Sequence, residues 1–137
     1  MKGYLLDTDT VIQLLRRSAS VWQALLRAEE AGLPVWLNAL SYYETRRGLL
    51  VSGATAQAQR FEQLCQRLGM VPIDLPVLDK AAEIYADLYR LGTLIADADL
   101  LIAASAVVND LVLVTHNQRH FQRIPNLALE DWYGEEG

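Results

Sequence analysis

The sequence predicts a three-layer α/β/α fold around a central, mainly parallel β-sheet. Short apolar runs of strand length alternate with longer segments in which apolar residues recur at helical spacing. This alternation favours parallel pairing, because each helix carries the chain back to the start of the next strand. Of the 137 residues, 52% are hydrophobic, so the chain can bury a core, and we expect one domain.

Five short segments are predicted to form the strands of this sheet. They are apolar or β-branched, and turn residues border most of them. The run at 111–117 is the strongest strand, whereas the run at 70–75 fits either a strand or an extended connector. The expected strands are residues 3–8, 33–38, 70–75, 111–117 and 128–132, of which the last is a short edge strand.

Six longer segments separate these strands and are predicted to be helices. Gly32, Gly53, Gly69 and Gly92 each stand where a helical pattern stops, as residues that end helices do. The segment that starts at Asp97 is almost wholly apolar, so its helix is expected to be central. The expected helices are residues 9–17, 18–32, 39–53, 54–69, 76–92 and 97–110.

Acidic and polar residues follow several strands, at the points where sites form in α/β sheets. Ligands bind at the carboxyl ends of parallel strands, and these ends are followed by Asp7, by residues 38–44 and by residues 115–117. Asp97 and Asp99 open the central helix and can reach the same edge. The sequence therefore predicts a functional site built from these elements.

Helix capping is the alternative task for the first of these carboxylates. Asp7 or Asp9 can cap the first helix, and Asp9 is the better placed, which leaves Asp7 without a structural task. Glu44 either completes a capping box with Ser41 or lies inside a helix that begins at Asn38, where its carboxylate is free. Neither acid, taken alone, distinguishes a cap from a functional group.

The pair Asp97 and Asp99 directly precedes the apolar helix. Asp97 fits the N-cap, and Asp99 then lies in the first turn, where the helix dipole favours an acid. A carboxylate at the start of a buried helix persists only when it is paired, hydrogen-bonded or bound to a cation. Converging carboxylates repel one another unless a metal neutralises them. An all-oxygen ligand set suits Mg²⁺ or Mn²⁺.

Composition restricts the kind of protein. The formal net charge of −5 argues against a simple basic nucleic-acid-binding module, unless several acids bind a cation that reverses the local charge. The single cysteine, Cys65, has the spacing of a core residue and cannot form an intramolecular disulfide. Charges interrupt every apolar run, and the N-terminus is too acidic for a signal peptide, so we expect a cytoplasmic protein that does not enter a membrane.

Four segments resemble one known family in order and spacing. They are "LLDTDT", "SYYE", "DADLLIAASA" and "LVLVTHNQRHFQRIPNLALEDW", and together they are similar to PIN-domain proteins of the VapC toxin type. The resemblance spans nearly the whole chain and implies one PIN domain over residues 1–137, with a three-layer PIN-like fold. It also implies a Mg²⁺- or Mn²⁺-dependent endoribonuclease that cleaves tRNA or rRNA with a metal-activated water. Such toxins pair with a VapB-type antitoxin and commonly form homodimers.

The resemblance implies roles for individual acids. Asp7, Glu44 and Asp99 match the metal-binding acids of the family and are the expected ligands. Asp97 stands where the family has no fixed acid, so it is expected to cap its helix or to support the ligands. Asp9 stands where the family often has Asn, and it is expected to support the ligands too.

The segment "THNQRHF" departs from the family's pattern. The family often has a fourth acid there, and this chain lacks it, which removes one ligand from a second metal position. Asn117 joins the expected catalytic set because it can orient a water or a ligand, and Thr115 can hydrogen-bond a carboxylate. His120 is expected to be a surface or packing residue, since single histidines seldom bind hard cations.

Basic and amphipathic segments suggest where partners bind. Four arginines are candidate contacts for RNA phosphates, and a solvated helix face is the alternative for each of them. These are Arg16, Arg17, Arg46 and Arg47. The amphipathic segments 21–32 and 58–69 mainly serve the core, but they can also form a groove for an antitoxin helix.

Other functions share some of these features. A stand-alone PIN nuclease of RNA processing needs no antitoxin, and a PIN module that binds RNA or protein without cleaving it needs no fourth acid. A receiver-like signalling domain also gathers aspartates at strand ends, but it needs a Lys near the last strand, where this chain has "VTHNQRH". The intact set of three acids favours the nuclease.

Overall fold

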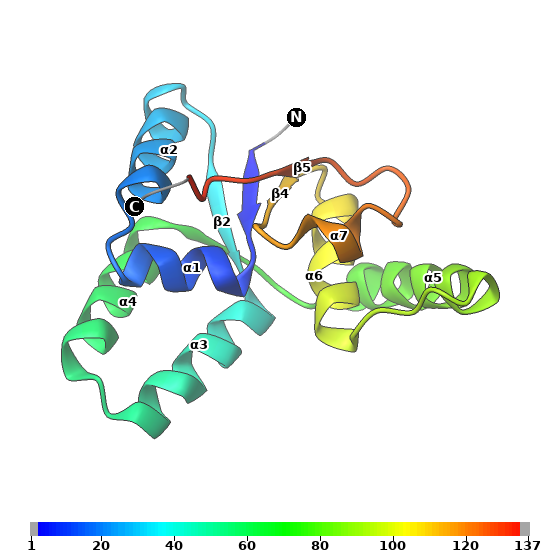
Figure 1. Cartoon of the computed structure of the whole chain (residues 1–137), viewed down its shortest axis with the longest axis horizontal. Helices are drawn as coiled ribbons and strands as arrows, with labels where there is room; N and C mark the ends of the chain where they lie inside the picture. Colours follow the sequence, from blue (N-terminus) through cyan, green and yellow to red (C-terminus); the bar gives the residue numbers. More distant parts are fainter. Residues whose placement is uncertain (1–2, 135–137) are drawn as a thin grey trace.

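One parallel sheet lies at the centre of the protein, whose structure is a computed structural model that describes residues 3–134 (Figure 1). The five strands stand in the order β3-β2-β1-β4-β5, and every neighbouring pair is parallel. All five predicted strands form, and the segment at 70–75 contributes to a strand. The strands are β1 Tyr4–Leu6, β2 Val35–Asn38, β3 Gly69–Val71, β4 Val112–Val114 and β5 Leu129–Glu130.

Helices connect these strands, and all six predicted helices form. They are α1 Thr8–Leu15, α2 Ala19–Glu30, α3 Ala39–Ser52, α4 Thr55–Arg67, α5 Leu75–Leu91, α6 Asp97–Val108 and α7 Gln118–Phe121. The four-residue α7 is absent from the prediction because one turn is too short to show a helical period. Gly53 and Gly92 end α3 and α5 with φ angles of +69° and +68°, the left-handed conformation that glycine adopts at a helix end. No helix between residues 3 and 134 is long and apolar enough to cross a membrane.

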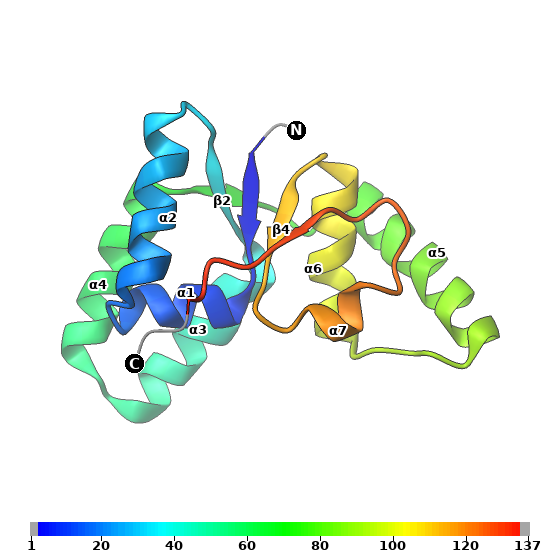
Figure 2. The ribbon, with the colours of Figure 1, turned by 45° about the horizontal axis from the view of Figure 1, so that its top comes forward.

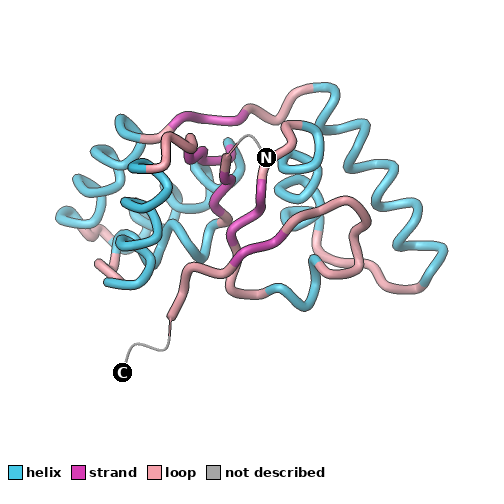
Figure 3. Tube along the Cα trace, turned by 90° about the horizontal axis from the view of Figure 1, so that it is seen from above, coloured by secondary structure: helices cyan, strands magenta, loops and turns pink. Residues whose placement is uncertain are grey.

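Helices cover both faces of the sheet, which confirms the predicted α/β/α arrangement (Figure 1, Figure 3). In β1, Leu5 packs in the cluster that includes α5 and α6, whereas Leu6 packs in the cluster that includes α1 and α2. Both leucines are fully buried. Successive side chains of a strand point to opposite faces, so a strand covered on both faces is apolar throughout.

The helix that was predicted to be central is α6. Ile102, Ala103, Ala104 and Ala106 are at most 2% exposed, and their small size lets α6 pack closely against its neighbours. Asn38, at the end of β2, donates a hydrogen bond from Nδ2 to Ser105 Oγ at 2.7 Å. This buried bond ties α6 to the carboxyl edge of the sheet.

The chain that follows α7 runs back across the sheet towards α1 and α2 (Figure 2). Trp132 packs edge-on against Tyr4, with ring centroids 5.3 Å apart. The backbone N–H of Gly134 donates to Ser20 Oγ at 2.8 Å. These contacts hold the tail beside β1 and α2.

Candidate active site

The carboxyl ends of β1, β2 and β4 meet at one edge of the sheet. Leu6, the last residue of β1, pairs in register with the residues near the ends of both neighbouring strands. Asp7, Asn38 and Thr115 therefore lie at neighbouring positions, and all three side chains are buried. This edge is the one that the sequence predicts for the site.

Asp7 is the N-cap of α1. Its Oδ1 accepts a hydrogen bond from the backbone N–H of Thr10 at 2.9 Å. The prediction that Asp9 is the cap is wrong, because β1 ends at Leu6 and α1 begins at Thr8, which leaves only Asp7 between strand and helix. Asp9 instead lies exposed in the first turn of α1.

The environment of Asp7 disfavours its charged form. Only 6% of the residue is exposed. Burial raises the pKa of the Asp7 carboxyl, and hydrogen bonds from the Thr115 hydroxyl and from Thr10 offset part of this effect. The negative charge of Asp9 raises the pKa further. A cation close to such a buried carboxylate would stabilise its charged form.

Glu44 lies inside α3, and its carboxylate is free of any capping task. The helix begins at Ala39, after Asn38 accepts a hydrogen bond from the backbone N–H of Leu40 at 2.8 Å. The capping-box alternative with Ser41 is therefore wrong, and the alternative in which the helix begins at Asn38 is confirmed. The Thr8 hydroxyl donates to Glu44 Oε1 at 2.8 Å, which links the start of α1 to α3.

Asp99 faces the other acids, whereas Asp97 does not. Burial raises the pKa of the Asp99 carboxyl, nearby His120 lowers it, and the charges of Glu44 and Asp9 raise it. The predicted N-cap role of Asp97 is wrong, because α6 begins at Asp97 itself and Ala96 occupies the cap position. Asp97 is exposed and lines a hollow against α5.

His120 lies at the surface, as the sequence prediction expects, and it also approaches Asp99, which no feature of the sequence indicates. Its Nδ1 lies 3.7 Å from Asp99 Oδ2, longer than a hydrogen bond, and this buried atom has no hydrogen-bond partner among the described residues. The side chain is 44% exposed. The one-turn α7 turns His120 towards α6, and no periodic signal in the sequence marks so short a helix.

Asn117 and Thr115 lie at the end of β4 as predicted. Thr115 is fully buried and hydrogen-bonds to Asp7, and its Oγ1 accepts from the backbone N–H of Asn117 at 3.2 Å. Asn117 is exposed and stands at the start of α7, where its side chain makes no capping hydrogen bond. The amide of Asn117 is thus available to a ligand at this edge.

Comparison with known proteins decides the family. The family model of the PIN domain matches residues 4–127. The chain belongs to the PIN-domain family. The resemblance to PIN-domain proteins of the VapC type is confirmed, because curated VapC ribonucleases and VapBC complexes are among the similar proteins.

Two curated relatives indicate how this PIN domain compares in sequence. Ribonuclease VapC2 from Rickettsia felis is 27% identical over 130 residues, which cover 94% of this chain and 97% of the relative. The tRNA(fMet)-specific endonuclease VapC from Salmonella typhimurium is 38% identical over 71 residues, which cover 52% of this chain and 54% of the relative. The first relation therefore spans nearly the whole chain.

Solved structures share the fold. The structure of VapBC2 from Rickettsia felis bound to a DNA fragment from their promoter matches with a TM-score of 0.88 at 24% identity, over 94% of this chain and 98% of that chain. The structure of DNA-bound VapBC from Salmonella typhimurium matches with a TM-score of 0.87 at 28% identity, over 96% of this chain and 99% of that chain.

The acids of this PIN domain fit the chemistry of a hard cation, but they do not form a closed ligand cluster. Asp7, Glu44 and Asp99 come from three elements and offer carboxylate oxygens, which Mg²⁺ and Mn²⁺ prefer. Within residues 3–134, no three His, Cys, Asp or Glu side chains lie close enough together to hold one metal ion. The donor set therefore fits, and the carboxylates would have to turn towards one another to share an ion.

The candidate arginines of this PIN domain do not gather at one place. Arg47 Nη2 lies 4.0 Å from Glu44 Oε2, where it neutralises part of the acidic edge. Arg16 lines a cavity together with Asp9, and Arg46 is exposed. The fourth, Arg17, belongs to a different surface.

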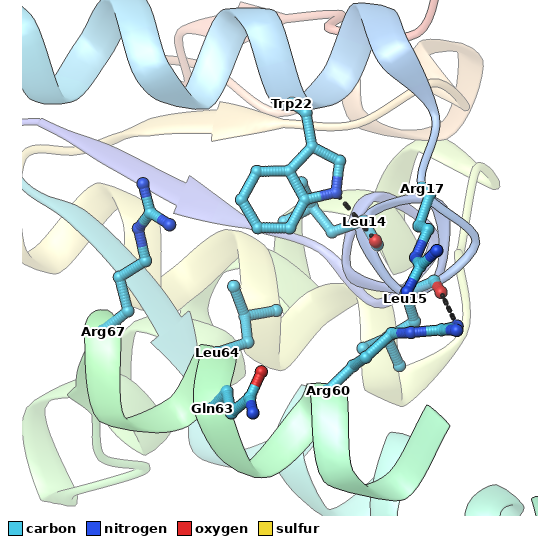
Figure 4. A pocket seen from close by; sticks show the side chains of 8 residues that line it. All are labelled: Leu14, Leu15, Arg17, Trp22, Arg60, Gln63, Leu64 and Arg67. Carbon is cyan, nitrogen blue, oxygen red and sulfur yellow. Dashed lines mark hydrogen bonds between the residues drawn. The ribbon is translucent and has the colours of Figure 1, made fainter. Parts of the chain in front are cut away.

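That surface is a groove between α1, α2 and α4, with a volume of about 400 Å³ (Figure 4). Its floor is apolar, with Trp22 on one side, and three guanidinium groups rim it. The floor is Leu14, Leu15 and Leu64, and the rim is Arg17, Arg60 and Arg67. Hydrogen bonds from Trp22 Nε1 to the Leu14 carbonyl (2.9 Å) and from Arg60 to the Leu15 carbonyl (3.2 Å) fix its walls. We call it the arginine-rimmed groove.

Proposed function

We propose that this PIN domain is a divalent-metal-dependent endoribonuclease, the toxin of a type II toxin–antitoxin module, and that it cleaves structured RNA such as tRNA or rRNA. The observation that carries the proposal is that Asp7, Glu44 and Asp99, from three different elements, lie along the same carboxyl edge of the sheet. Its relatives that match nearly the whole chain are named ribonucleases. The name of the Salmonella relative refers to tRNA(fMet), which makes tRNA the first substrate to test.

The three acids are the proposed ligands of Mg²⁺ or Mn²⁺. Bound there, the cation would lower the pKa of a water and neutralise charge on the scissile phosphate. The Thr115 hydroxyl orients the Asp7 carboxylate, and the Thr8 hydroxyl orients Glu44. Both hydroxyls hold the two carboxylates at the edge of the sheet where the scissile phosphate of the RNA is proposed to bind.

Other side chains at the edge support these ligands. Asn117 lies beside Thr115 with a free amide that can orient a water. Arg47 lies beside Glu44 and can contact an RNA phosphate. Asp9 adds negative charge near Asp7 and Asp99, which strengthens the attraction for a cation.

We infer that the arginine-rimmed groove is the seat of the antitoxin. An amphipathic helix buries its apolar face in a groove of this kind. The rim of Arg17, Arg60 and Arg67 favours a partner segment that places acidic side chains beside an apolar stripe. The named structural neighbours are VapBC assemblies, which supports a VapB-type partner for this chain. The homodimer that the resemblance implies remains part of the proposal.

The test is cleavage of a total tRNA pool and of rRNA by the purified, antitoxin-free protein. The reactions contain Mn²⁺, Mg²⁺ or EDTA, and Asp7→Asn and Asp87→Asn proteins are run beside the wild type. Asp87 is an exposed acid on α5, so its variant controls for the loss of one charge. Discrete fragments that need the metal and Asp7 support the proposal.

Two other results would contradict it. Fragments that persist in EDTA or with the Asp7→Asn protein would mean that the metal site is wrong. A folded wild-type protein that binds RNA but never cleaves it would favour a non-cleaving PIN module, for which the missing fourth acid is the supporting feature.

A further inference from the structure

A second cavity opens directly beside the acidic edge. It has a volume of about 360 Å³, and its lining includes Asp9, Gln13, Arg16, Val21, His116 and Tyr133. The charge of Asp9 raises the pKa of both Asp7 and Asp99, so Asp9 lies within the field of the proposed metal ligands. Because Asp9 lines the cavity and lies in the first turn of the helix that Asp7 caps, the cavity adjoins the acidic edge.

One wall of the cavity is aromatic and held in place. The rings of His116 and Tyr133 lie 4.9 Å apart at 56°. Asp131 fixes both residues, because one carboxylate oxygen lies 2.9 Å from His116 Nδ1 and the other accepts from the backbone N–H of Tyr133 at 2.9 Å. The next residue, Gly134, donates to Ser20 on α2. These contacts hold the ring of His116 and the backbone of Tyr133 at this wall.

The opposite wall is one polar face of α1. Asp9, Gln13 and Arg16 are spaced by four and then three residues, so they line the same side of the helix. The Gln13 amide offers both a donor and an acceptor, and the Arg16 guanidinium offers only donors. The cavity is thus lined by two tilted aromatic rings, by an amide that can read a polar edge and by a guanidinium that can contact a phosphate.

We propose that this cavity, which we call the base pocket, binds one unstacked nucleobase of the RNA substrate beside the cleaved phosphodiester. The base stacks on Tyr133, Gln13 hydrogen-bonds its polar edge, and Arg16 contacts the adjoining phosphate. This inference rests on the proposed ribonuclease function and adds to it the residues that select the nucleotide at the cleavage position.

The chemistry of the base pocket favours a nucleobase over a protein side chain. The arginine-rimmed groove has a leucine floor suited to an apolar helix, whereas the base pocket combines two aromatic rings with an amide and a guanidinium. Base stacking on aromatic side chains and hydrogen bonds to base edges are the means by which proteins read single-stranded RNA.

The experiment measures cleavage of a single-stranded RNA library with randomised nucleotides, in Mn²⁺, followed by sequencing of the new ends. Wild type, Tyr133→Ala, Tyr133→Phe, Gln13→Ala and Tyr89→Ala proteins are compared. Tyr89 is an exposed tyrosine on α5 and serves as the matched control. Thermal unfolding of every variant verifies that it is folded.

The inference predicts that Tyr133→Ala lowers kcat/KM about tenfold, because a stacked base is lost. Tyr133→Phe, which keeps the ring, and Tyr89→Ala stay within about twofold of wild type. Gln13→Ala flattens the nucleotide preference beside the cut, a readout that a structural role of Gln13 would not change. Fluorescence anisotropy with a labelled ten-nucleotide RNA, in Ca²⁺, is expected to show the same order of affinities.

The results separate this inference from the proposed function. If wild type cleaves and the Tyr133→Ala and Gln13→Ala proteins keep both its rate and its nucleotide preference, the base pocket is refuted while the ribonuclease stands. If the Tyr133→Ala protein loses only affinity for the antitoxin, the cavity is a protein-binding site and the inference is wrong. A wild type that neither binds nor cleaves RNA overturns both.

Discussion

The two ends of α1 lead to surfaces of opposite character. At its start lies the acidic edge, which contains Asp7, Asp9, Glu44 and Asp99. Carboxylate oxygens of Asp7 and Glu44 accept hydrogen bonds there. Past its end lies the arginine-rimmed groove, which is apolar with a cationic border. Acidic side chains at the start of a helix and cationic side chains after its end both interact favourably with the helix dipole.

The net charge of −5 describes neither of these two surfaces. Negative charge is concentrated at the acidic edge, where a metal cation and an RNA phosphate are proposed to bind. Positive charge is concentrated at the arginine-rimmed groove, where an acidic partner helix is proposed to bind. The two surfaces should therefore respond separately to substitution.

Asp99→Asn tests the acidic edge. The substitution keeps the shape of the side chain and removes a proposed ligand, so we expect cleavage to fall by about 10³-fold or more. Antitoxin affinity should not change, because Asp99 is not part of the groove. Cleavage rates and a titration with the cognate antitoxin measure both. An equal loss of both properties would mean that the surfaces are not separate.

Arg60→Glu tests the groove. Arg60 lies on the rim and donates to the Leu15 carbonyl, so reversing its charge should weaken antitoxin binding by about thirtyfold. Cleavage by the free protein should stay as in wild type. Arg27→Glu, at an exposed position on α2 outside the groove, is the matched control. Equal antitoxin affinity of the Arg60→Glu and Arg27→Glu proteins would refute the groove as the antitoxin-binding site.

Thr115→Val tests the hydroxyl that orients Asp7. Valine keeps the volume but cannot donate, so we expect kcat/KM to fall about tenfold. Because the Thr115 bond lowers the pKa of Asp7, its loss should raise that pKa, and the acid limb of the pH–rate profile should move to higher pH. Thr115→Ser keeps a hydroxyl and is the control. An unchanged profile in the valine protein would contradict this role.

Asp7→Asn should stabilise the metal-free protein while it abolishes cleavage. Burial raises the pKa of Asp7 in the folded state above the ordinary aspartate value of 3.8. Wild-type stability therefore falls as pH rises from about 3.8 through the folded-state pKa. Asn caps helices as well as Asp does and carries no charge. We expect a Tm about 1–4 °C above wild type at neutral pH in EDTA, and no gain near pH 3. A Tm below that of wild type at neutral pH would show that the negative charge of Asp7 does not destabilise the metal-free protein.

Glu29→Gln gives the smallest effect, although Glu29 pairs with the groove residue Arg67. Arg67 Nε donates to Glu29 Oε2 at 2.8 Å, but the two side chains remain 40% and 32% exposed. Solvent screening limits the pair to about 0.5 kcal/mol of stability. The Arg67 hydrogen bond lowers the pKa of Glu29 below the ordinary glutamate value of 4.5, so the stability that the pair contributes is lost as pH falls through and below that value. Denaturant unfolding at low and high salt measures it, and a change above about 1 kcal/mol would show that screening is weaker than assumed.

Much of the fold was predictable because the patterns are local and repeated. Strand-length apolar runs and glycine-terminated helical segments are visible in the sequence, and the parallel pairing of the strands follows from their alternation. The burial of α6 follows from its almost wholly apolar composition. The short α7 was not predictable, because four residues carry no period.

The site was predictable in place but not in detail. Strand ends select Asp7 and Thr115, and the start of α6 selects Asp99. The caps depend on shifts of one or two residues that a sequence pattern does not resolve, which is why Asp9 and Asp97 were assigned wrongly. The position of His120 beside Asp99 depends on tertiary packing alone.

The most direct test of the central claim is a Mn²⁺ titration followed by electron paramagnetic resonance. The claim is that acids from three elements form one metal site for RNA cleavage. Wild type should bind Mn²⁺, and Asp7→Asn, Glu44→Gln and Asp99→Asn should each weaken binding about tenfold or more. Asp97→Asn, whose side chain faces α5, should bind as wild type does. Equal binding by wild type and the three ligand variants would contradict the account.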